Sequence, residues 1–513
     1  MFYIALISLF TILLIGAWKL FNSIWVQPRK LEKYLRSQGL KGNRYRLLFG
    51  DVKEIYSLHK QAHSTTLSPY DDTLSRMMPF MAKTVRTYGK NSFAWIGPKP
   101  SIIITQPDLM KVVLNDYRTY PRHIKGANKI LRMVLEAFVY YEGDEWNKTR
   151  GKLNPAFHVE QLKMKIPGIQ ECAENILNQW EKQIREDGSS VIDVFHLLQD
   201  YTASVVTETL FSTPFNDEKR RTFHNIKSIP ITDIAFNIPG FWYLPTERKR
   251  KAIELDKKIR NTFTSMINER LRMRMAGIKD DQWDLLDILL NKLYDGNMSN
   301  NRERTRIIEE AIAQFKLFYI AGSDTTSSLL LWTLVMLAAH QEWQARAREE
   351  VVQVFGNSKK LNSDGLNRLK IVSMIFNEVL RLYPPTTEID RIVEEDTQLG
   401  GLRIPKGTFL QLPVALLHRD LEIWGKDALE FRPDRFAEGV LKAANGQAAA
   451  LLPFSWGPRI CIGQNFALVQ AKIFLAQLLR KFSFELAPTY KHAPYVNISI
   501  LPQYGAPLLL RKL

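Results

Sequence analysis

One long helical segment in the middle of the chain places the strongest constraint on the fold. Apolar residues recur at helical spacing from about Thr305 to Ala339, and between Leu317 and Leu337 nearly every face of the predicted helix is apolar. Such a helix is expected to pass through the centre of the body. A polar insert, Gly322 to Ser328, interrupts the apolar run. Because this insert costs helix stability, we expect the helix either to bend there around something or to unwind locally to form a site.

The rest of the body is predicted to form one domain. After about residue 45 no Gly/Ser linker, low-complexity tract or internal repeat divides the chain. Strand-like alternation is confined to short stretches at 92–105, 389–409 and 498–510. With 45% hydrophobic residues and only two cysteines, the chain is neither disordered nor stapled by disulfides. We therefore predict a mainly α fold with minor β-sheets over residues 46–513.

The N-terminus has the composition of a membrane anchor. Phe2 to Trp18 carries no charge, and as a helix it would rise about 25 Å, close to the ~30 Å of a bilayer's hydrocarbon core. Basic residues follow this run and do not precede it, which favours a retained anchor over a cleaved signal peptide. The same residues keep the body on the cytosolic side. We predict a single-pass anchor at 1–26 and a basic linker at 27–45; a buried N-terminal core helix is the alternative.

The excess of positive charge requires an acidic partner. Lysine and arginine number 70 against 53 acidic residues, a net charge of +17. Arg248 to Lys251 follows an apolar stretch at 234–244 that contains aromatic residues, a pattern that suits an anionic lipid surface. Basic patches interleaved with stacking aromatics are not evident, so we predict no nucleic-acid binding. The charge is assigned to membrane lipid and an acidic electron-transfer partner.

A loop rich in glycine and proline, Pro453 to Gly463, places Cys461 directly before an apolar helix predicted at Phe466 to Leu479. Backbone N–H groups at a helix start lower the pKa of a thiol and can bind its thiolate. A single thiolate without a nearby second cysteine or histidine does not suit zinc or an iron–sulfur cluster. Haem iron needs only one protein ligand, so this loop is the candidate haem site.

The loop also carries a family resemblance. Its pattern Phe-x-x-Gly-x-Arg-x-Cys-x-Gly, from Phe454 to Gly463, resembles the haem-ligand loop of the cytochrome P450 family, a highly specific signature. The resemblance covers essentially the whole chain after the anchor. It implies a single P450-type helical domain with small β-sheets, haem b as the cofactor and Cys461 as the ligand of its iron. Phe454 and Gly463 are implied as further cofactor contacts.

Two more motifs follow in the family's order. Glu378-Val379-Leu380-Arg381 resembles the family's Glu-x-x-Arg helix motif, and Phe431 to Phe436 resembles the segment whose arginine, here Arg435, joins that pair. Alone, a Glu/Arg pair at i, i+3 is more often a surface salt bridge. The resemblance instead implies a structural triad of Glu378, Arg381 and Arg435.

Four residues are implied as contacts of the haem propionates. Trp146 and Arg150 stand at i, i+4 on a predicted helix and match the family's Trp-x-x-x-Arg motif. Arg391, after two prolines, resembles a second propionate contact, and Arg459 belongs to the cysteine loop. Arginine suits this role because its planar fork binds a carboxylate through two hydrogen bonds.

The polar insert of the long helix resembles the family's oxygen-activation motif. Asp324 precedes Thr325 there, and a hydroxyl backed by a carboxylate can pass protons from water into an apolar pocket. The resemblance therefore implies that Asp324 and Thr325 are catalytic residues of a proton relay. The alternative is that the Thr325 hydroxyl merely bonds a carbonyl of its own helix.

Finer similarities resemble a plant clan that includes secologanin synthase and triterpenoid oxidases. The resemblance implies a monooxygenase of the endoplasmic-reticulum membrane that inserts one atom of O₂ into an unactivated C–H bond of a lipophilic substrate. The expected substrate is a terpenoid: an iridoid, triterpenoid or diterpenoid. Electrons are expected from NADPH through cytochrome P450 reductase, because no flavin- or nicotinamide-binding Gly-x-Gly-x-x-Gly occurs in this chain.

Other functions remain open at this point. One is inactivation of a plant hormone such as a gibberellin, brassinosteroid or cytokinin by hydroxylation. A haem-thiolate isomerase or dehydratase would have lost the acid–threonine pair, so Asp324 and Thr325 argue against it. A silent membrane scaffold is disfavoured by Cys461 and Arg459. Glu388 and Asp390 stand in a usually apolar stretch and face either solvent, which we favour, or the substrate pocket.

Overall fold

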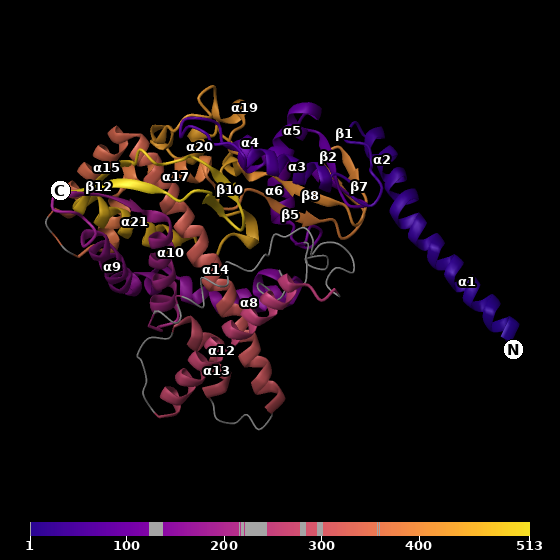
Figure 1. The fold of residues 1–513 in the computed structure, drawn as a ribbon, viewed down its shortest axis with the longest axis horizontal. Coiled ribbons are helices and arrows are strands. Elements are labelled where there is room, and N and C mark those ends of the chain that lie inside the picture. Colours follow the sequence, from indigo (N-terminus) through magenta and orange to yellow (C-terminus); the bar gives the residue numbers. More distant parts are fainter. Residues whose placement is uncertain are drawn as a thin grey trace.

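The computed structural model describes residues 2–122, 137–214, 216, 220, 244–276, 284–294, 301–356, 358 and 360–513. Helices dominate these ranges and the strands form small sheets, so the predicted mainly α fold with minor β is confirmed. Figure 1 shows the long helix α14 running through the body, and several of the strands grouped beside the N-terminal helices. Most of the apolar stretch at 234–244 lies outside the described residues.

Helix α14 (Asn301–Ala339) is continuous through its polar insert, so the chain does not unwind there. The hydroxyls of Ser323 and Thr325 donate to carbonyls one turn earlier in the same helix, each at 2.6 Å. Thr202 of α10 (Val194–Val205) donates to the Ser323 carbonyl at 2.9 Å. A Cβ atom at Gly322 would lie 2.9 Å from Val206. The insert therefore lets two helices approach closely while its polar groups stay bonded.

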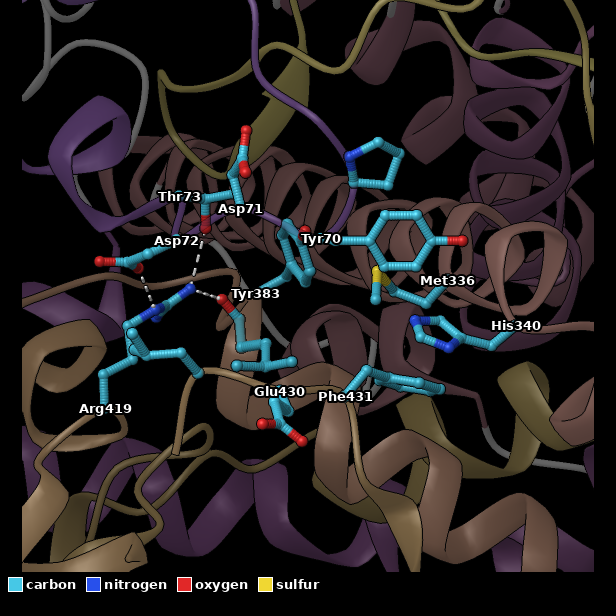
Figure 2. A pocket seen from close by; sticks show the side chains of 13 residues that line it. Tyr70, Asp71, Asp72, Thr73, Met336, His340, Tyr383, Arg419, Glu430 and Phe431 are labelled. Carbon is cyan, nitrogen blue, oxygen red and sulfur yellow. Dashed lines mark hydrogen bonds and ion pairs between the residues drawn. The ribbon is translucent and has the colours of Figure 1, made fainter. Parts of the chain in front are cut away.

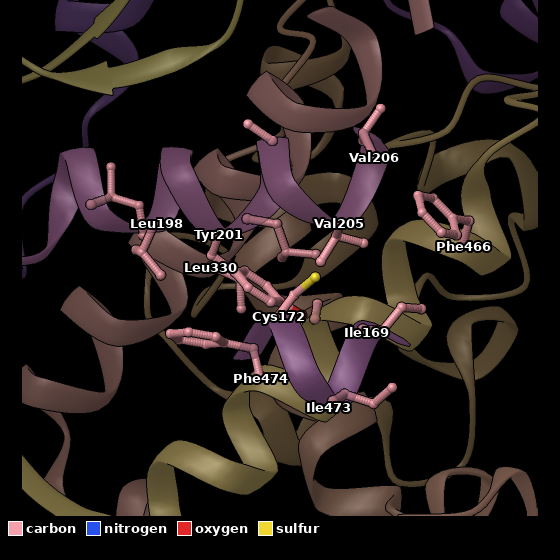
Figure 3. Close-up of a cluster of buried hydrophobic side chains, with 14 of the residues drawn as sticks. Ile169, Cys172, Leu198, Tyr201, Val205, Val206, Leu330, Phe466, Ile473 and Phe474 are labelled. Carbon is pink, nitrogen blue, oxygen red and sulfur yellow. The ribbon is translucent and has the colours of Figure 1, made fainter. Parts of the chain in front are cut away.

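The main core surrounds the buried two thirds of α14. Three helices packed there are α9 (Val159–Glu181), α10 and α21 (Gln464–Lys481). Cys172 of α9 lies among their apolar side chains, next to Val205 and Ile169, as Figure 3 shows. Burial raises the pKa of the Cys172 thiol to about 12. The thiol therefore stays protonated and unreactive at neutral pH.

The remaining helices are mostly short. The α-helices are α3 (Val52–Ala62), α4 (Leu74–Met77), α5 (Pro79–Tyr88), α6 (Pro107–Asn115), α8 (Gly143–Leu153), α12 (Glu247–Met275), α13 (Leu285–Tyr294), α15 (Gln341–Phe355), α16 (Ser363–Arg368), α17 (Lys370–Leu382), α18 (Val414–Leu417), α19 (Leu421–Trp424) and α20 (Val440–Ala443). The 3₁₀ and π turns are η2 (Phe138–Tyr140), η3 (Asn154–Phe157), η4 (Val206–Leu210), η7 (Pro433–Phe436), η8 (Ala448–Ala450) and η9 (Gly457–Arg459).

Four small sheets complete the described structure. The five-stranded sheet has the order β1 (Lys41–Gly42), β2 (Ser92–Ile96), β3 (Lys99–Ile103), β8 (Phe409–Leu412), β5 (Ile389–Ile392). The three-stranded sheet has the order β4 (Ser189–Asp193), β12 (Pro507–Lys512), β9 (Phe482–Leu486). The two hairpins are β6 (Thr397–Leu399) with β7 (Leu402–Ile404) and β10 (Pro494–Val496) with β11 (Ile500–Pro502). All three predicted stretches contain strands, whereas β1, β4, β9 and β10 lie outside them.

The N-terminal helix leaves the body. Helix α1 (Phe2–Phe21) has no buried residue, and it continues through η1 (Asn22–Val26) into α2 (Gln27–Ser37). Two described helices are long and apolar enough to cross a membrane: this one and α14. The apolar window of α14 is 83% buried and that of the N-terminal helix 0%, so α14 is a core helix. The exposed helix α1 fits a membrane anchor.

A buried histidine makes the stability of this fold sensitive to acid. His418 is fully buried; its Nε2 accepts the Leu452 N–H at 2.9 Å, and its Nδ1 lies 3.2 Å from the Arg381 carbonyl oxygen. Burial, together with the charges of Arg381 and Arg419, lowers the pKa of His418 to about 3. The folded protein therefore keeps this imidazole neutral down to a pH at which the unfolded chain has already protonated it.

We expect the free energy of unfolding to fall as the pH drops from about 6.5 towards 3, because only the unfolded chain takes up a proton on His418. The contribution is about 1.4 kcal/mol per pH unit in that window. Urea unfolding at several pH values measures it. His418→Gln should flatten the slope, and His158→Gln, which changes an exposed histidine, should not. Equal slopes in the wild type and His418→Gln would contradict the assignment.

Candidate active site

The loop that carries Cys461 is built on close backbone contacts. The Cys461 N–H donates to the Phe454 carbonyl at 2.9 Å, and η9 precedes the cysteine. Gly457 has φ +72°, and a Cβ atom there would lie 2.7 Å from the Leu114 carbonyl oxygen at the end of α6. Only glycine fits both constraints. Phe454 and Ile462 are partly buried against the main core, so the loop is held at both ends.

The thiol of Cys461 has accessible surface, yet the surrounding protein removes much of its hydration and raises its pKa. The Gly463 N–H and the charges of Arg150 and Arg122 act in the opposite direction. The N–H at the helix start therefore lowers the pKa of Cys461, as expected from the sequence, but the loss of hydration outweighs this contribution. Helix α21 begins at Gln464, three residues after the cysteine, and the field of a helix end falls off within one turn.

Two buried arginines near this loop have donors without partners. Arg391 of β5 is 1% exposed and Arg459 of η9 is 3% exposed. Among the described residues, Nε and Nη2 of Arg391 and Nε and Nη1 of Arg459 have no hydrogen-bond acceptor. Burial lowers the pKa of Arg391 to about 9 and that of Arg459 to about 10. Both stay charged at neutral pH, so these donors suit a ligand that brings carboxylates.

Contacts of Arg459 connect the cysteine loop to α8. Its Nη2 donates to the Tyr141 carbonyl at 2.8 Å and pairs with the Glu142 carboxylate. Its Cζ lies 4.5 Å from the centre of the buried Trp146 ring. Arg150, one turn further along α8, donates from Nε to Asn154 at 2.9 Å. The structure thus brings Trp146 and Arg459 into direct contact and leaves Arg150 turned towards the helix end.

The acid–threonine pair lies on α14. Asp324 is 3% exposed, and its Oδ2 accepts a hydrogen bond from Ser499 at 2.5 Å. Thr325 is partly exposed and donates to the Ala321 carbonyl, so the bond of the alternative interpretation is present. This bond uses the hydroxyl hydrogen and leaves the oxygen able to accept. Gln470 of α21 donates to the hydroxyl of the next residue, Thr326, at 3.3 Å, which connects the insert to the helix after Cys461.

The Glu-x-x-Arg pair is fully buried. Nε and Nη2 of Arg381 donate to the two carboxylate oxygens of Glu378 at 2.7 and 2.8 Å, and both side chains are 0% exposed. Nε of Arg435 reaches the same carboxylate at 3.0 Å. Arg381 also donates to the carbonyls of His418 and Ala428. The structure therefore brings the three predicted residues together in one bonded cluster.

Two contacts of the candidate site could not be found from the sequence. Ser499, which bonds Asp324, lies 175 residues further along the chain, and Glu142, which pairs with Arg459, lies 317 residues before it. Neither residue belongs to a sequence motif that would mark it as part of a site. Glu388 is half-buried and Asp390 is exposed to solvent. Loss of hydration raises the pKa of both carboxyls, and repulsion from Asp390 adds to the effect on Glu388.

A separate cavity of about 270 Å³ lies between the loop before α4 and the ends of α14 and α17. Figure 2 shows Tyr70, His340 and Phe431 on one side and Arg419 on the other. Arg419 is already bonded to Asp72 at 3.2 Å and to the Thr73 hydroxyl. None of the predicted site residues lines this cavity, so we do not assign it to the reaction.

Comparison with known proteins defines the class as haem-dependent monooxygenases. The family model "Cytochrome P450" matches residues 72–504. The chain is 43% identical to 7-deoxyloganic acid hydroxylase of Catharanthus roseus over 505 residues, 97% of this chain and 96% of the relative. It is 40% identical to secologanin synthase 2 of the same plant over 514 residues (99% and 96%), and 42% identical to 11-oxo-beta-amyrin 30-oxidase of Glycyrrhiza uralensis over 500 residues (96% and 94%).

The chain therefore belongs to the cytochrome P450 family. The predicted resemblance to the plant clan with secologanin synthase and triterpenoid oxidases is confirmed. Membership makes the protein a monooxygenase that uses haem, O₂ and electrons from a reductase, and that acts on small lipophilic substrates.

Arg381→Leu should destabilise the protein by about 3–5 kcal/mol, because it leaves the Glu378 carboxylate buried without its two-point partner. Arg432→Leu is the matched control: its exposed pairs with Asp427 and Asp434 are worth less than about 1 kcal/mol. Chemical unfolding of the detergent-solubilised protein measures both. If Arg381→Leu does not fold, its soluble yield beside that of Arg432→Leu gives the comparison. Equal losses in the two variants would contradict the argument.

Proposed function

We propose that this protein is a membrane-anchored haem-thiolate monooxygenase that hydroxylates a terpenoid at an unactivated carbon. The observation that carries the proposal is the pair of buried arginines, Arg391 and Arg459, whose free donors stand near the loop of a single thiol, Cys461. The names of the relatives support the substrate class, since 7-deoxyloganic acid is an iridoid and 11-oxo-beta-amyrin a triterpenoid.

In this proposal the chain holds haem b through residues of the loop and its neighbours. Cys461 would ligate the iron through Sγ, and Arg391 and Arg459 would pair with the propionates through their free donors. Trp146 would hold Arg459 in place through ring contact, and Arg150 would add a further positive charge. When bound, haem supplies the one-electron chemistry that cleaves O₂.

Asp324 and Thr325 are proposed to move protons within α14. The Asp324 carboxylate is fixed by the Ser499 hydroxyl, and the Thr325 oxygen can still accept a hydrogen bond while its hydrogen is donated to the Ala321 carbonyl. Protons would pass from the carboxylate to the hydroxyl and on to the reacting oxygen. Glu378, Arg381 and Arg435 act at a distance by fixing the chain that leads to the cysteine loop.

The proposed location is the endoplasmic-reticulum membrane, with the catalytic domain in the cytosol. Helix α1 would span the bilayer and the basic residues after it would remain on the cytosolic side. We keep the division into an anchor at 1–26, a basic linker at 27–45 and a catalytic domain at 46–513. NADPH would supply electrons through cytochrome P450 reductase, which approaches the positively charged domain.

The experiment that tests the function is a carbon-monoxide difference spectrum of the dithionite-reduced protein in microsomes. Cys461→Ala should lose the strongly red-shifted Soret band, because the iron loses its thiolate. Cys172→Ala, which changes a buried thiol of α9, should keep the band. A red-shifted band in Cys461→Ala would refute the ligand. Titration of the wild type with iridoids, triterpenoids and gibberellins should give a low- to high-spin shift with a terpenoid of the first two classes.

Thr325→Ala should leave the thiolate spectrum intact and divert reducing equivalents from product to hydrogen peroxide. Thr333→Ala is a close control, because Thr333 donates to the Leu329 carbonyl at 2.7 Å in the same helix, as Thr325 does to Ala321. The ratio of product to NADPH consumed separates the two variants. Fully coupled turnover in Thr325→Ala, or equal uncoupling in both, would leave Thr325 with a helical role alone.

A further inference from the structure

Glu142 stands directly before α8, yet its carboxylate does not cap this helix. An acidic group at a helix start can accept the free N–H groups there. The Glu142 carboxylate instead accepts the Arg122 N–H at 3.1 Å and pairs with Nη2 of Arg459. One partner lies 20 residues before it and the other 317 residues after it. The carboxylate therefore joins distant segments and leaves the end of its own helix to other partners.

Arg122 brings a third arginine to the site of Arg391 and Arg459. Ile392 of β5 donates its N–H to the Pro121 carbonyl at 3.0 Å, so Arg122 and Arg391 each stand next to the same backbone hydrogen bond. Loss of hydration lowers the pKa of Arg122, and the charge of the Glu142 carboxylate acts in the opposite direction. The segment that ends at Arg122 is thus joined to β5 by one bond and to Glu142 by another.

All three arginines act on Glu142. Burial raises the pKa of the Glu142 carboxyl, and the charges of Arg459, Arg122 and Arg391 oppose this rise. Within the part of the chain that the structure describes, Glu142 is the acidic partner of Arg459. Three cations gathered in a region of low dielectric repel one another unless an acidic group lies among them. The Glu142 carboxylate therefore lets the arginines stay close together.

The same contact fixes the direction of the Arg459 guanidinium. Nη2 is occupied by Glu142 and by the Tyr141 carbonyl, and the Trp146 ring lies against the flat face of the group. The donors without an acceptor are those on Nε and Nη1, as described above for this part of the chain. A guanidinium is rigid and planar, so anchoring one nitrogen sets the directions of all the other donors.

We propose that Glu142 is a positioning residue of the cofactor site, which orients Arg459 so that its unpartnered donors receive the carboxylates of the cofactor. The inference rests on the proposed haem site and goes beyond it, because no motif of the sequence contains Glu142. The residue acts through Arg459 and not by direct contact with the cofactor. Its negative charge also acts on the haem through space and favours the oxidised iron.

The first test compares two substitutions of Glu142 in the full-length ferric holoprotein in detergent. Glu142→Gln removes the charge but keeps an oxygen that can accept both N–H groups, whereas Glu142→Ala removes the charge and the acceptor. The rate of haem transfer to excess apomyoglobin is measured for each variant. We expect Glu142→Ala to release haem about tenfold faster than Glu142→Gln, because only the glutamine variant keeps an anchor for Nη2 of Arg459 at this position. Equal rates would overturn the proposal.

The second test measures the reduction potential of the haem. Glu142→Gln should raise this potential, because loss of a nearby negative charge favours the reduced iron. Glu145→Gln is the matched control: it removes an exposed acid from the first turn of α8 and should leave the potential close to that of the wild type. Equal shifts in the two variants would assign the effect to the net charge of the helix and overturn the proposal. If Glu142→Ala does not fold, this comparison still decides.

The outcomes separate this inference from the haem site on which it rests. A wild type without the red-shifted carbon-monoxide band overturns the proposed function and the inference with it. A wild type with the band, together with equal haem release from Glu142→Gln and Glu142→Ala, overturns the inference alone. Faster release from Glu142→Ala with the band intact supports it. Loss of the band in Glu142→Ala would assign Glu142 to the fold of the cysteine loop and overturn the positioning role.

Discussion

The bidentate pair between Glu378 and Arg381 is the interaction on which the site depends. The chain from residue 413 to the cysteine loop has little regular structure, so its buried backbone groups need partners from elsewhere. Arg381 supplies donors to three carbonyls of this segment, those of His418, Ala428 and Glu430. A buried ion pair adds little net stability, but here it specifies one path for an irregular chain. The position of Cys461 is a consequence of that path.

The second constraint is the polar insert in α14. Seven small or polar residues in succession would destabilise a buried helix if their hydroxyl groups lacked defined hydrogen-bond partners. Ser323 and Thr325 bond their own helix, while Ser328 donates to the Ile500 carbonyl at 2.8 Å. Because Gly322 has no Cβ atom, Val206 at the end of α10 can pack directly against the backbone of α14. The helix can therefore carry a carboxylate and a hydroxyl through an apolar core without breaking.

Local pattern was enough to predict the long helix, the three regions that contain strands and the helix after Cys461, because periodicity and loop composition act over a few residues. The site residues came from motifs of similar length. What the sequence could not provide was contact between distant segments, such as Ser499 with Asp324 or Glu142 with Arg459. The sequence also could not show that loss of hydration outweighs the lowering of the Cys461 pKa by the helix start, because hydration of a thiol depends on everything packed around it.

The free donors of Arg391 and Arg459 have a consequence for the life of the protein in the cell. Two buried cations with unmet donors weaken the folded chain until a ligand with carboxylates reaches them. Such a ligand binds the folded chain and not the unfolded one, so by mass action its concentration sets the folded fraction. Abundance would then follow the supply of the cofactor as well as the rate of synthesis, and chains made in excess of that supply would be exposed to proteolysis.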